Sequence, residues 1–211
     1  MIKNAKEIDL ETYPRANHFR YFKDMQNPFL GFTVNVDITD FLKKTKENGY
    51  PFFLSFLYKT VKSANSVPEL RRRIYNDKII EFENCDSSHT VALENGTYCY
   101  CRLDCKKPFK EFLLYALSEQ KKAAEKGSID ENEDEALSCF FVSTVPWINY
   151  TSLIQPTVSG SDSNVRITWG KYAETNGRTF MPVSILCHHA LVDGIHISEF
   201  YNDLNKNLAE F

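Results

Sequence analysis

Residues 184–197 read SILCHHALVDGIHI, a stretch in which an apolar run leads directly into two histidines. Asp193 and Gly194 follow His189 by four and five residues. The apolar run, which continues back from Ser184, predicts a buried strand with His188 and His189 at its end. Side chains alternate along a strand, so at most one of the two histidines faces a given site. A neutral imidazole in that position can accept a proton near pH 7, which makes it a candidate general base.

A histidine at the end of a buried strand can instead be structural, with both ring nitrogens in hydrogen bonds inside the core. For a single histidine, this structural role is more common than a catalytic one. Two adjacent histidines that point to opposite faces are poorly placed to bind one metal ion, and no third ligand stands out. We therefore expect no metal. The complete spacing H-H-x-x-x-D-G is far more specific than either histidine alone.

The composition predicts one globular domain over residues 1–211, because 43% hydrophobic and 25% charged residues are typical of folded proteins of this size. A formal charge of -3, with lysine and arginine scattered among acidic residues, argues against nucleic acid as a partner. Residues 1–10 mix charged and apolar positions, unlike a signal peptide, and no apolar run is long enough to span a bilayer. We expect a cytoplasmic protein with no membrane partner.

Six cysteines occur, and a reducing compartment would keep them as thiols. Cys99, Cys101 and Cys105, with His89 nearby, invite comparison with a zinc site. The spacing lacks the paired C-x-x-C units of such sites. The pattern favours buried, small apolar side chains instead.

Hydrophobic periodicity and turn residues predict an α+β fold with a mixed or largely antiparallel sheet, since hairpins and helices do not simply alternate. The acidic run 130–135 is expected to be a loop. The expected strands are 29–38, a hairpin within 70–82 that turns at Tyr75-Asn76-Asp77, a hairpin of 90–93 with 97–103, then 139–144, 165–172 and 178–187. The expected helices are 15–23, one from Thr39 as N-cap to Gly49, one opened by Pro51 and closed before Val67-Pro68, 108–126 with Gly127 as its stop, and 195–208.

The segment HHALVDGIHI, residues 188–197, resembles the active-site signature of the chloramphenicol acetyltransferases. Other segments resemble the family's elements in the same order, so the likeness extends over residues 13–208. They are Arg15-Ala16-Asn17-His18-Phe19 for R-x-x-H-F, Gly31-Phe32 for the following G-F, Ser143-Thr144-Val145-Pro146-Trp147 for S-x-x-P-W, and Ile167-Thr168 with Lys171-Tyr172 for I-T-x-x-K-Y.

The resemblance implies a coenzyme A-dependent acyltransferase fold, a two-layer sandwich with a large mixed β-sheet, assembled as a homotrimer. Acetyl-CoA is then the cosubstrate and no metal takes part. His189 would remove the proton of the acceptor hydroxyl, Ser143 would donate to the oxyanion, and Thr168 would hold a water nearby. Asp193 would pair with Arg15 to hold the loop behind the histidine, and a backbone carbonyl would set the ring tautomer.

The resemblance also implies two groups of binding residues. The coenzyme A group is Trp147, Lys171 and Tyr172. The sequence departs from the family at three places on the acceptor side. Tyr21-Phe22 stands where the family usually has Phe-Tyr, and Tyr100 stands where a small residue is usual. The loop of residues 23–30 is about two residues longer than in the family. Core packing is the competing interpretation for each aromatic residue. The acceptor group is Tyr21, Phe22, Phe29, Phe32, Tyr98, Tyr100 and Leu153.

Larger acyltransferases with this motif place two such halves in one chain, so we expect a second copy of this chain to supply the other wall of the site. The expected function is acetylation of chloramphenicol or a related aromatic antibiotic, and hence drug resistance. A dihydrolipoyl acyltransferase core is the first alternative, disfavoured because no lipoyl-bearing region precedes the motifs. A noncatalytic trimeric ligand-binding homologue is the second, disfavoured by the intact His189, Ser143, Arg15 and Asp193.

Overall fold

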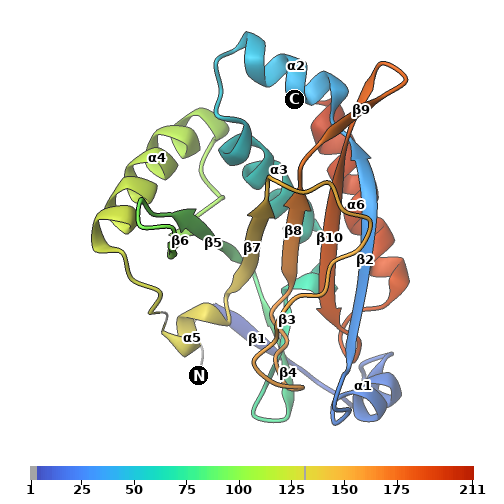
Figure 1. The fold of residues 1–211 in the computed structure, drawn as a ribbon. Helices are drawn as coiled ribbons and strands as arrows, with labels where there is room; N and C mark the ends of the chain where they lie inside the picture. Colours follow the sequence, from blue (N-terminus) through green and yellow to red (C-terminus); the bar gives the residue numbers. More distant parts are fainter. Residues whose placement is uncertain (1–3, 131) are drawn as a thin grey trace.

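The computed structural model describes residues 4–130 and 132–211. These residues form a seven-stranded sheet in the order β2-β10-β8-β7-β5-β6, with the short strand β9 paired to β10 (Figure 1). The β5–β7 and β7–β8 pairs are parallel and the other pairs are antiparallel, so the expected mixed sheet is confirmed. The strands are β2 (Phe29–Asp37), β5 (Asp86–Ala92), β6 (Tyr98–Leu103), β7 (Cys139–Val145), β8 (Arg166–Gly170), β9 (Ala173–Thr175) and β10 (Arg178–His188).

A second, three-stranded sheet has the order β1-β4-β3 and comprises β1 (Ala5–Ile8), β4 (Lys78–Phe82) and β3 (Arg72–Tyr75). The predicted β3–β4 hairpin is confirmed, and its turn places Asn76 and Asp77 at φ 49° and 60°. Asparagine and aspartate tolerate that left-handed conformation better than other side chains. Strand β1 was not predicted, because its four residues carry no pattern of their own and pair with β4 far along the chain.

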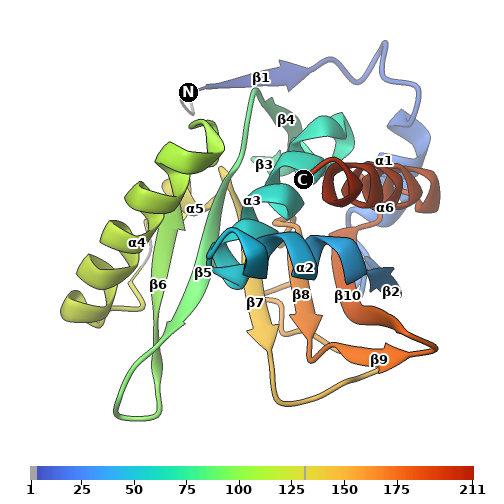
Figure 2. The same cartoon turned by 90° about the horizontal axis from the view of Figure 1, so that it is seen from above.

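The helices are α1 (Ala16–Phe22), α2 (Thr39–Glu47), α3 (Phe52–Ser66), the 3-10 turn η1 (Pro68–Arg71), α4 (Phe109–Lys126), α5 (Glu133–Ala136) and α6 (Gly194–Ala209). Pro51 occupies the N-cap of α3 and Gly127 closes α4 at φ 63°, as predicted. Helices α3 and α6 pack on one face of the large sheet (Figures 1 and 2). The segment between β7 and β8 crosses the opposite face (Figure 1).

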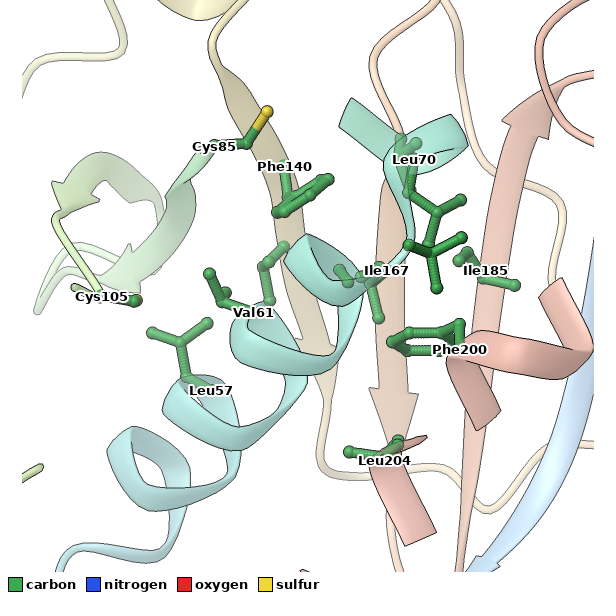
Figure 3. Packing of buried hydrophobic residues seen from close by; sticks show 14 of the residues in the cluster. Leu57, Val61, Leu70, Cys85, Cys105, Phe140, Ile167, Ile185, Phe200 and Leu204 are labelled. Atoms are coloured by element: carbon green, nitrogen blue, oxygen red, sulfur yellow. The ribbon is translucent and has the colours of Figure 1, made fainter. Parts of the chain in front are cut away.

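The core lies between α3, α6 and the large sheet (Figure 3). Burial of each large apolar side chain there contributes roughly 1.5–3 kcal/mol to folding. All six cysteines lie in the described part, buried and reduced, which confirms their interpretation as small core side chains. The contacting residues include Leu57 and Val61 of α3, Phe200 and Leu204 of α6, and Phe140, Ile167 and Ile185 of β7, β8 and β10.

One prediction for a helix and one for a loop are wrong. Ile38, not Thr39, occupies the N-cap of α2, and Asp37 Oδ1 accepts the Thr39 N–H at 2.9 Å from outside the helix. The acidic run is not all loop, because α5 begins at Glu133 within it; residue 131 lies outside the described residues. Asn132 starts this helix, since its Oδ1 accepts the Glu135 N–H at 3.1 Å.

Two element faces that carry regularly spaced apolar residues are only half buried. On β2, Val36 is buried, as is Ile38 directly after the strand, whereas Phe32 and Val34 remain 46% and 37% exposed at this edge of the sheet. The buried stripe of α4 includes Phe112 and Leu113 but not Leu117, which is 48% exposed.

We expect the stability of the folded protein to depend on pH through His89 of β5. Its ring is 1% exposed, and burial lowers its pKa from 6.5 to about 4. Between pH 6.5 and 4 the unfolded chain therefore binds a proton that the folded chain does not, so the free energy of unfolding falls as the pH falls through this window, by up to about 3 kcal/mol. We expect His89→Phe to flatten this part of the curve, measured by urea unfolding at pH 4.5 to 7.5. Equal slopes for both proteins would contradict the assignment.

Candidate active site

His189 follows β10 directly and is held by the chain around it. Its backbone N–H donates to Pro28 O at 2.7 Å, and its ring lies on that of Phe22 of α1, with centroids 4.1 Å apart. Nδ1 is 2.9 Å from Val192 O. A carbonyl oxygen only accepts, so Nδ1 carries a hydrogen, and in the neutral form of the ring Nε2 carries the lone pair. Nε2 of His189 is therefore the atom that can take a proton, and a backbone carbonyl selects this tautomer.

The neighbouring His188 is engaged elsewhere. Its Nδ1 accepts the Ala190 N–H at 3.2 Å, and its Nε2 donates to Gly160 O at 3.0 Å. Burial lowers the pKa of His188, which keeps the ring neutral. With both nitrogens used and a ring that is 1% exposed, His188 holds the loop that contains Gly160.

An ion pair holds the loop behind His189. Arg15 Nη1 donates to Asp193 Oδ2 at 2.9 Å, and Arg15 Nη2 donates to His189 O at 3.1 Å. The Arg15 guanidinium lowers the pKa of the Asp193 carboxyl. Asp193 is also the N-cap of α6, where its Oδ1 accepts the Gly194 N–H at 2.7 Å. The carboxylate is thus engaged by Arg15 and the helix start, while Nδ1 of His189 is bound to Val192 O.

Gly194 begins α6 and does not form a left-handed turn, and a Cβ at this position would meet nothing within 4 Å. His196 completes the helix start, because its Nδ1 accepts the Asp193 N–H at 2.9 Å. The chain direction here comes from this capping box rather than from glycine flexibility.

Ser143 and Thr168 are direct neighbours on the parallel strands β7 and β8, and Ser184 of β10 continues the row. Thr33 of β2 ends it, with its Oγ1 2.7 Å from Ser184 Oγ. The flanking residues of β8 and β10 point into the core, so these hydroxyls point to the opposite face. The segment 146–165 crosses that face (Figure 1).

One chain does not bring His189 and Ser143 together. Ser184 is in register with Thr168, which is in register with Ser143, and His189 follows Ser184 by five residues. At about 3.3 Å per residue, roughly 16 Å of strand separates His189 from the hydroxyl row. That distance exceeds the combined reach of a histidine and a serine side chain. A single chain therefore holds the His189 ring and the hydroxyl row apart.

The predicted acceptor residues are divided in the same way. Phe22 contacts His189, Tyr21 packs edge-on against Phe22 at 4.9 Å, and Phe29 lies 5.8 Å from the ring of His188. The others lie elsewhere in the chain. They are Phe32 on the edge strand β2, Tyr98 and Tyr100 with ring centroids 5.8 Å apart on the opposite edge strand β6, and Leu153, half-buried, in the segment after β7.

The predicted coenzyme A residues lie together where β7 and β8 end. Val145 and Gly170 are the last register pair, and Trp147 and Lys171 follow them. The Lys171 N–H donates to Ile148 O at 2.8 Å, so the two loops are joined by a backbone hydrogen bond. Trp147 is 79% exposed and Tyr172 is 42% exposed. This end of the strands therefore presents an indole, an ammonium group and a phenol to solvent.

Sequence reasoning missed two residues of the segment after β7. Tyr150 Oη donates to Thr168 O at 2.9 Å, and Gln155 Oε1 accepts the Thr168 hydroxyl at 3.0 Å. A Cβ on Gly170 would lie 2.7 Å from Ile148 O and from the Tyr150 ring, so glycine is needed for this close approach. The segment has no periodicity, so no signal in the sequence marked either side chain.

No group of three His, Cys, Asp or Glu residues within 4–130 and 132–211 is placed to hold a metal ion. Over the same residues, no helix combines the length and apolar character needed to cross a bilayer.

Three comparisons place this architecture among known proteins. A chloramphenicol acetyltransferase from Klebsiella sp. is 28% identical, covering 97% of this chain and 94% of its own. A solved chloramphenicol acetyltransferase superposes with a TM-score of 0.89 at 28% identity, covering 97% of this chain and 99% of that one. A dihydrolipoamide acetyltransferase from Azotobacter vinelandii shares the fold, with a TM-score of 0.67 at 15% identity, covering 92% and 86% of the two chains.

The α+β fold, with its large mixed sheet, is therefore that of the acetyltransferases represented by these structures. The family model for chloramphenicol acetyltransferase matches residues 3–205. The chain belongs to the chloramphenicol acetyltransferase family, which confirms the resemblance drawn from its ordered motifs.

Proposed function

We propose that this protein transfers the acetyl group of acetyl-CoA to a hydroxyl of chloramphenicol or a related aromatic antibiotic, and so confers drug resistance. The observation that carries the proposal is the tautomer of His189. Its Nδ1 hydrogen is bound to Val192 O, which leaves Nε2 as a proton acceptor beside the ring of Phe22. Membership of the chloramphenicol acetyltransferase family supports the choice of donor and acceptor.

In the proposed reaction, Nε2 of His189 takes the hydroxyl proton while the hydroxyl oxygen attacks the thioester carbon. The Ser143 hydroxyl donates to the oxyanion, and Thr168 holds a water close to it. Collapse of the tetrahedral intermediate breaks the carbon–sulfur bond, and the leaving thiolate takes the proton back from His189. The acetyl group reaches the acceptor without a covalent enzyme intermediate.

The proposed assembly is a homotrimer with its sites between subunits. Each chain would form one acyltransferase domain, residues 1–211, as a two-layer sandwich of helices on the large sheet. The strand distance between His189 and Ser143 supports this, because His189 of one copy can meet the hydroxyl row of another. The segment after β7 also exposes apolar side chains that a second copy would cover, namely Ile148, Ile154 and Val158, which are 55, 99 and 91% exposed.

Within such an interface, we assign the aromatic acceptor pocket to residues of both subunits. The coenzyme A end would be Trp147, Lys171 and Tyr172, where an ammonium group and exposed rings suit a phosphorylated adenine nucleotide. The pocket would be Tyr21, Phe22 and Phe29 near His189 of one copy, with Phe32, Tyr98, Tyr100 and Leu153. We place the protein in the cytoplasm, where acetyl-CoA is available.

The test is acetylation by the purified full chain. Thiol release from acetyl-CoA should depend on chloramphenicol and should be measured across several phenicols, and sedimentation at assay concentration should give a trimer. Activity on dihydrolipoamide but not on phenicols would favour an acyltransferase of the dihydrolipoyl type. Tight chloramphenicol binding without turnover would indicate a noncatalytic binder. An active monomer would contradict the interface site.

Asp193→Asn tests the loop assignment. The amide keeps the helix cap but loses the ion pair with Arg15, so we expect kcat to fall about 10-fold and the free energy of unfolding to fall by only about 1 kcal/mol, since Asp193 is partly exposed. Steady-state kinetics and thermal unfolding measure both. Asp203→Asn, on the same helix, is the matched control. Unchanged activity and stability in Asp193→Asn would refute the pairing with Arg15.

A further inference from the structure

We infer that Gln155 is a positioning residue of the active site, which fixes the hydroxyl hydrogen of Thr168 and thereby the role of that hydroxyl in acetyl transfer. The inference deepens the proposed function and rests on it. Its basis is the hydrogen bond from Thr168 Oγ1 to Gln155 Oε1, at 3.0 Å, on the face of the sheet that carries Ser143.

The direction of this hydrogen bond decides what Thr168 can do. The amide oxygen of Gln155 has no hydrogen, so Thr168 is the donor and its single hydroxyl hydrogen is used. The lone pairs of Thr168 Oγ1 remain available to accept hydrogen bonds. Thr168 is 2% exposed, so few other partners compete for its hydroxyl. Towards a third group in the site, Thr168 is therefore an acceptor and not a donor.

The segment that carries Gln155 is held in place on the sheet. Tyr150 Oη donates to Thr168 O at 2.9 Å and accepts from Ser184 Oγ at 3.2 Å. The absence of a side chain at Gly170 lets the Tyr150 ring pack against β8. Thr168 is thus bound by this segment through both its main chain and its side chain. Gln155 is presented by an anchored segment, as a positioning residue requires.

This arrangement orients a water for the reaction. A water that donates one O–H to Thr168 Oγ1 has its other O–H free to donate to the oxyanion beside Ser143. Without Gln155, the Thr168 hydroxyl could rotate and donate its hydrogen to the same water. The water would then accept from Thr168, and its hydrogens would no longer point towards the oxyanion. Because Gln155 accepts the hydroxyl hydrogen of Thr168, that hydroxyl cannot donate to the water. Gln155 thus contributes to oxyanion stabilisation through Thr168 without touching the substrate.

A double-mutant cycle with Gln155→Leu and Thr168→Val tests the inference in the full-length enzyme. For Gln155→Leu we expect kcat with chloramphenicol to fall about 3- to 10-fold, the effect of one hydrogen bond, with KM for both substrates within about twofold. In the Thr168→Val background the same change should have no further effect on kcat, because its partner hydroxyl is gone. Gln155→Met, unbranched and of similar length, should repeat the Gln155→Leu result.

The matched control is Asn202→Leu, at an exposed amide side chain on α6, which should leave kcat unchanged. Wild-type acetylation is measured first, because its absence would count against the proposed function itself. With an active wild type, three results would overturn the role of Gln155 alone: an unchanged kcat in Gln155→Leu, a loss confined to KM, or an equal loss of kcat with and without Thr168. A purely structural role predicts the last of these.

Discussion

Replacing His189 with glutamine is expected to lower kcat by about 10³- to 10⁴-fold, with KM for chloramphenicol and acetyl-CoA changed little. Glutamine fills a similar volume and can still donate to Val192 O, but its amide accepts no proton near pH 7. The loss is that of a general base, which acts only as the hydroxyl is deprotonated in the transition state. Steady-state kinetics by thiol release measure it.

Two measurements test whether the loss of kcat in His189→Gln comes from misfolding. Thermal unfolding of His189→Gln should match that of the wild type. Among the residues that the structure describes, the His189 side chain makes only one hydrogen bond, to Val192 O, and one ring contact, with Phe22. Binding of acetyl-CoA, followed by calorimetry, should also be retained. A folded His189→Gln protein that keeps a tenth or more of wild-type kcat would show that another group takes the proton.

Replacing Arg73 with methionine is expected to lower the free energy of unfolding by about 3–5 kcal/mol. Arg73 is 0% exposed and lies 5.7 Å from the centroid of the Phe140 ring. Its guanidinium donates to backbone carbonyls that come from η1, from β3, from the end of α5 and from β7. They are those of Leu70, Arg72, Leu137 and Cys139, at 2.7 to 2.9 Å.

Methionine fills much of the space left by Arg73 but removes the guanidinium donor from each of these carbonyl oxygens. The Cys139 oxygen keeps the Asn164 side-chain amide as a donor, at 3.0 Å. Each unsatisfied buried group costs roughly 1–3 kcal/mol, and partial relaxation reduces the sum. Urea unfolding measures the change. Arg178→Met is the control, since Arg178 is 65% exposed beside Asp37 and should cost less than about 1 kcal/mol. A loss below about 1 kcal/mol in Arg73→Met would show that Arg73 does not join the two sheets.

Local patterns sufficed to predict most helices and strands. Alternation marked β2, Pro51 and Gly127 marked helix ends, and Tyr75-Asn76-Asp77 marked the turn between β3 and β4. These are properties of a few consecutive residues, so they are legible without knowledge of the partner strand. The N-cap of α2 failed because Asp37, outside the helix, takes the Thr39 N–H. Strand β1 failed because its pairing with β4 spans more than seventy residues.

The same division holds for the site. The amino-acid order alone identified His189, Asp193 and Arg15 as one constellation, since a family signature lies in spacing along the chain. Which nitrogen of His189 is free depends on Val192 O, and the state of the Thr168 hydroxyl depends on Gln155. The distance between His189 and Ser143 depends on the register of β7, β8 and β10. Hydrogen-bond direction and register arise only when distant segments pack, and no short-range pattern encodes them.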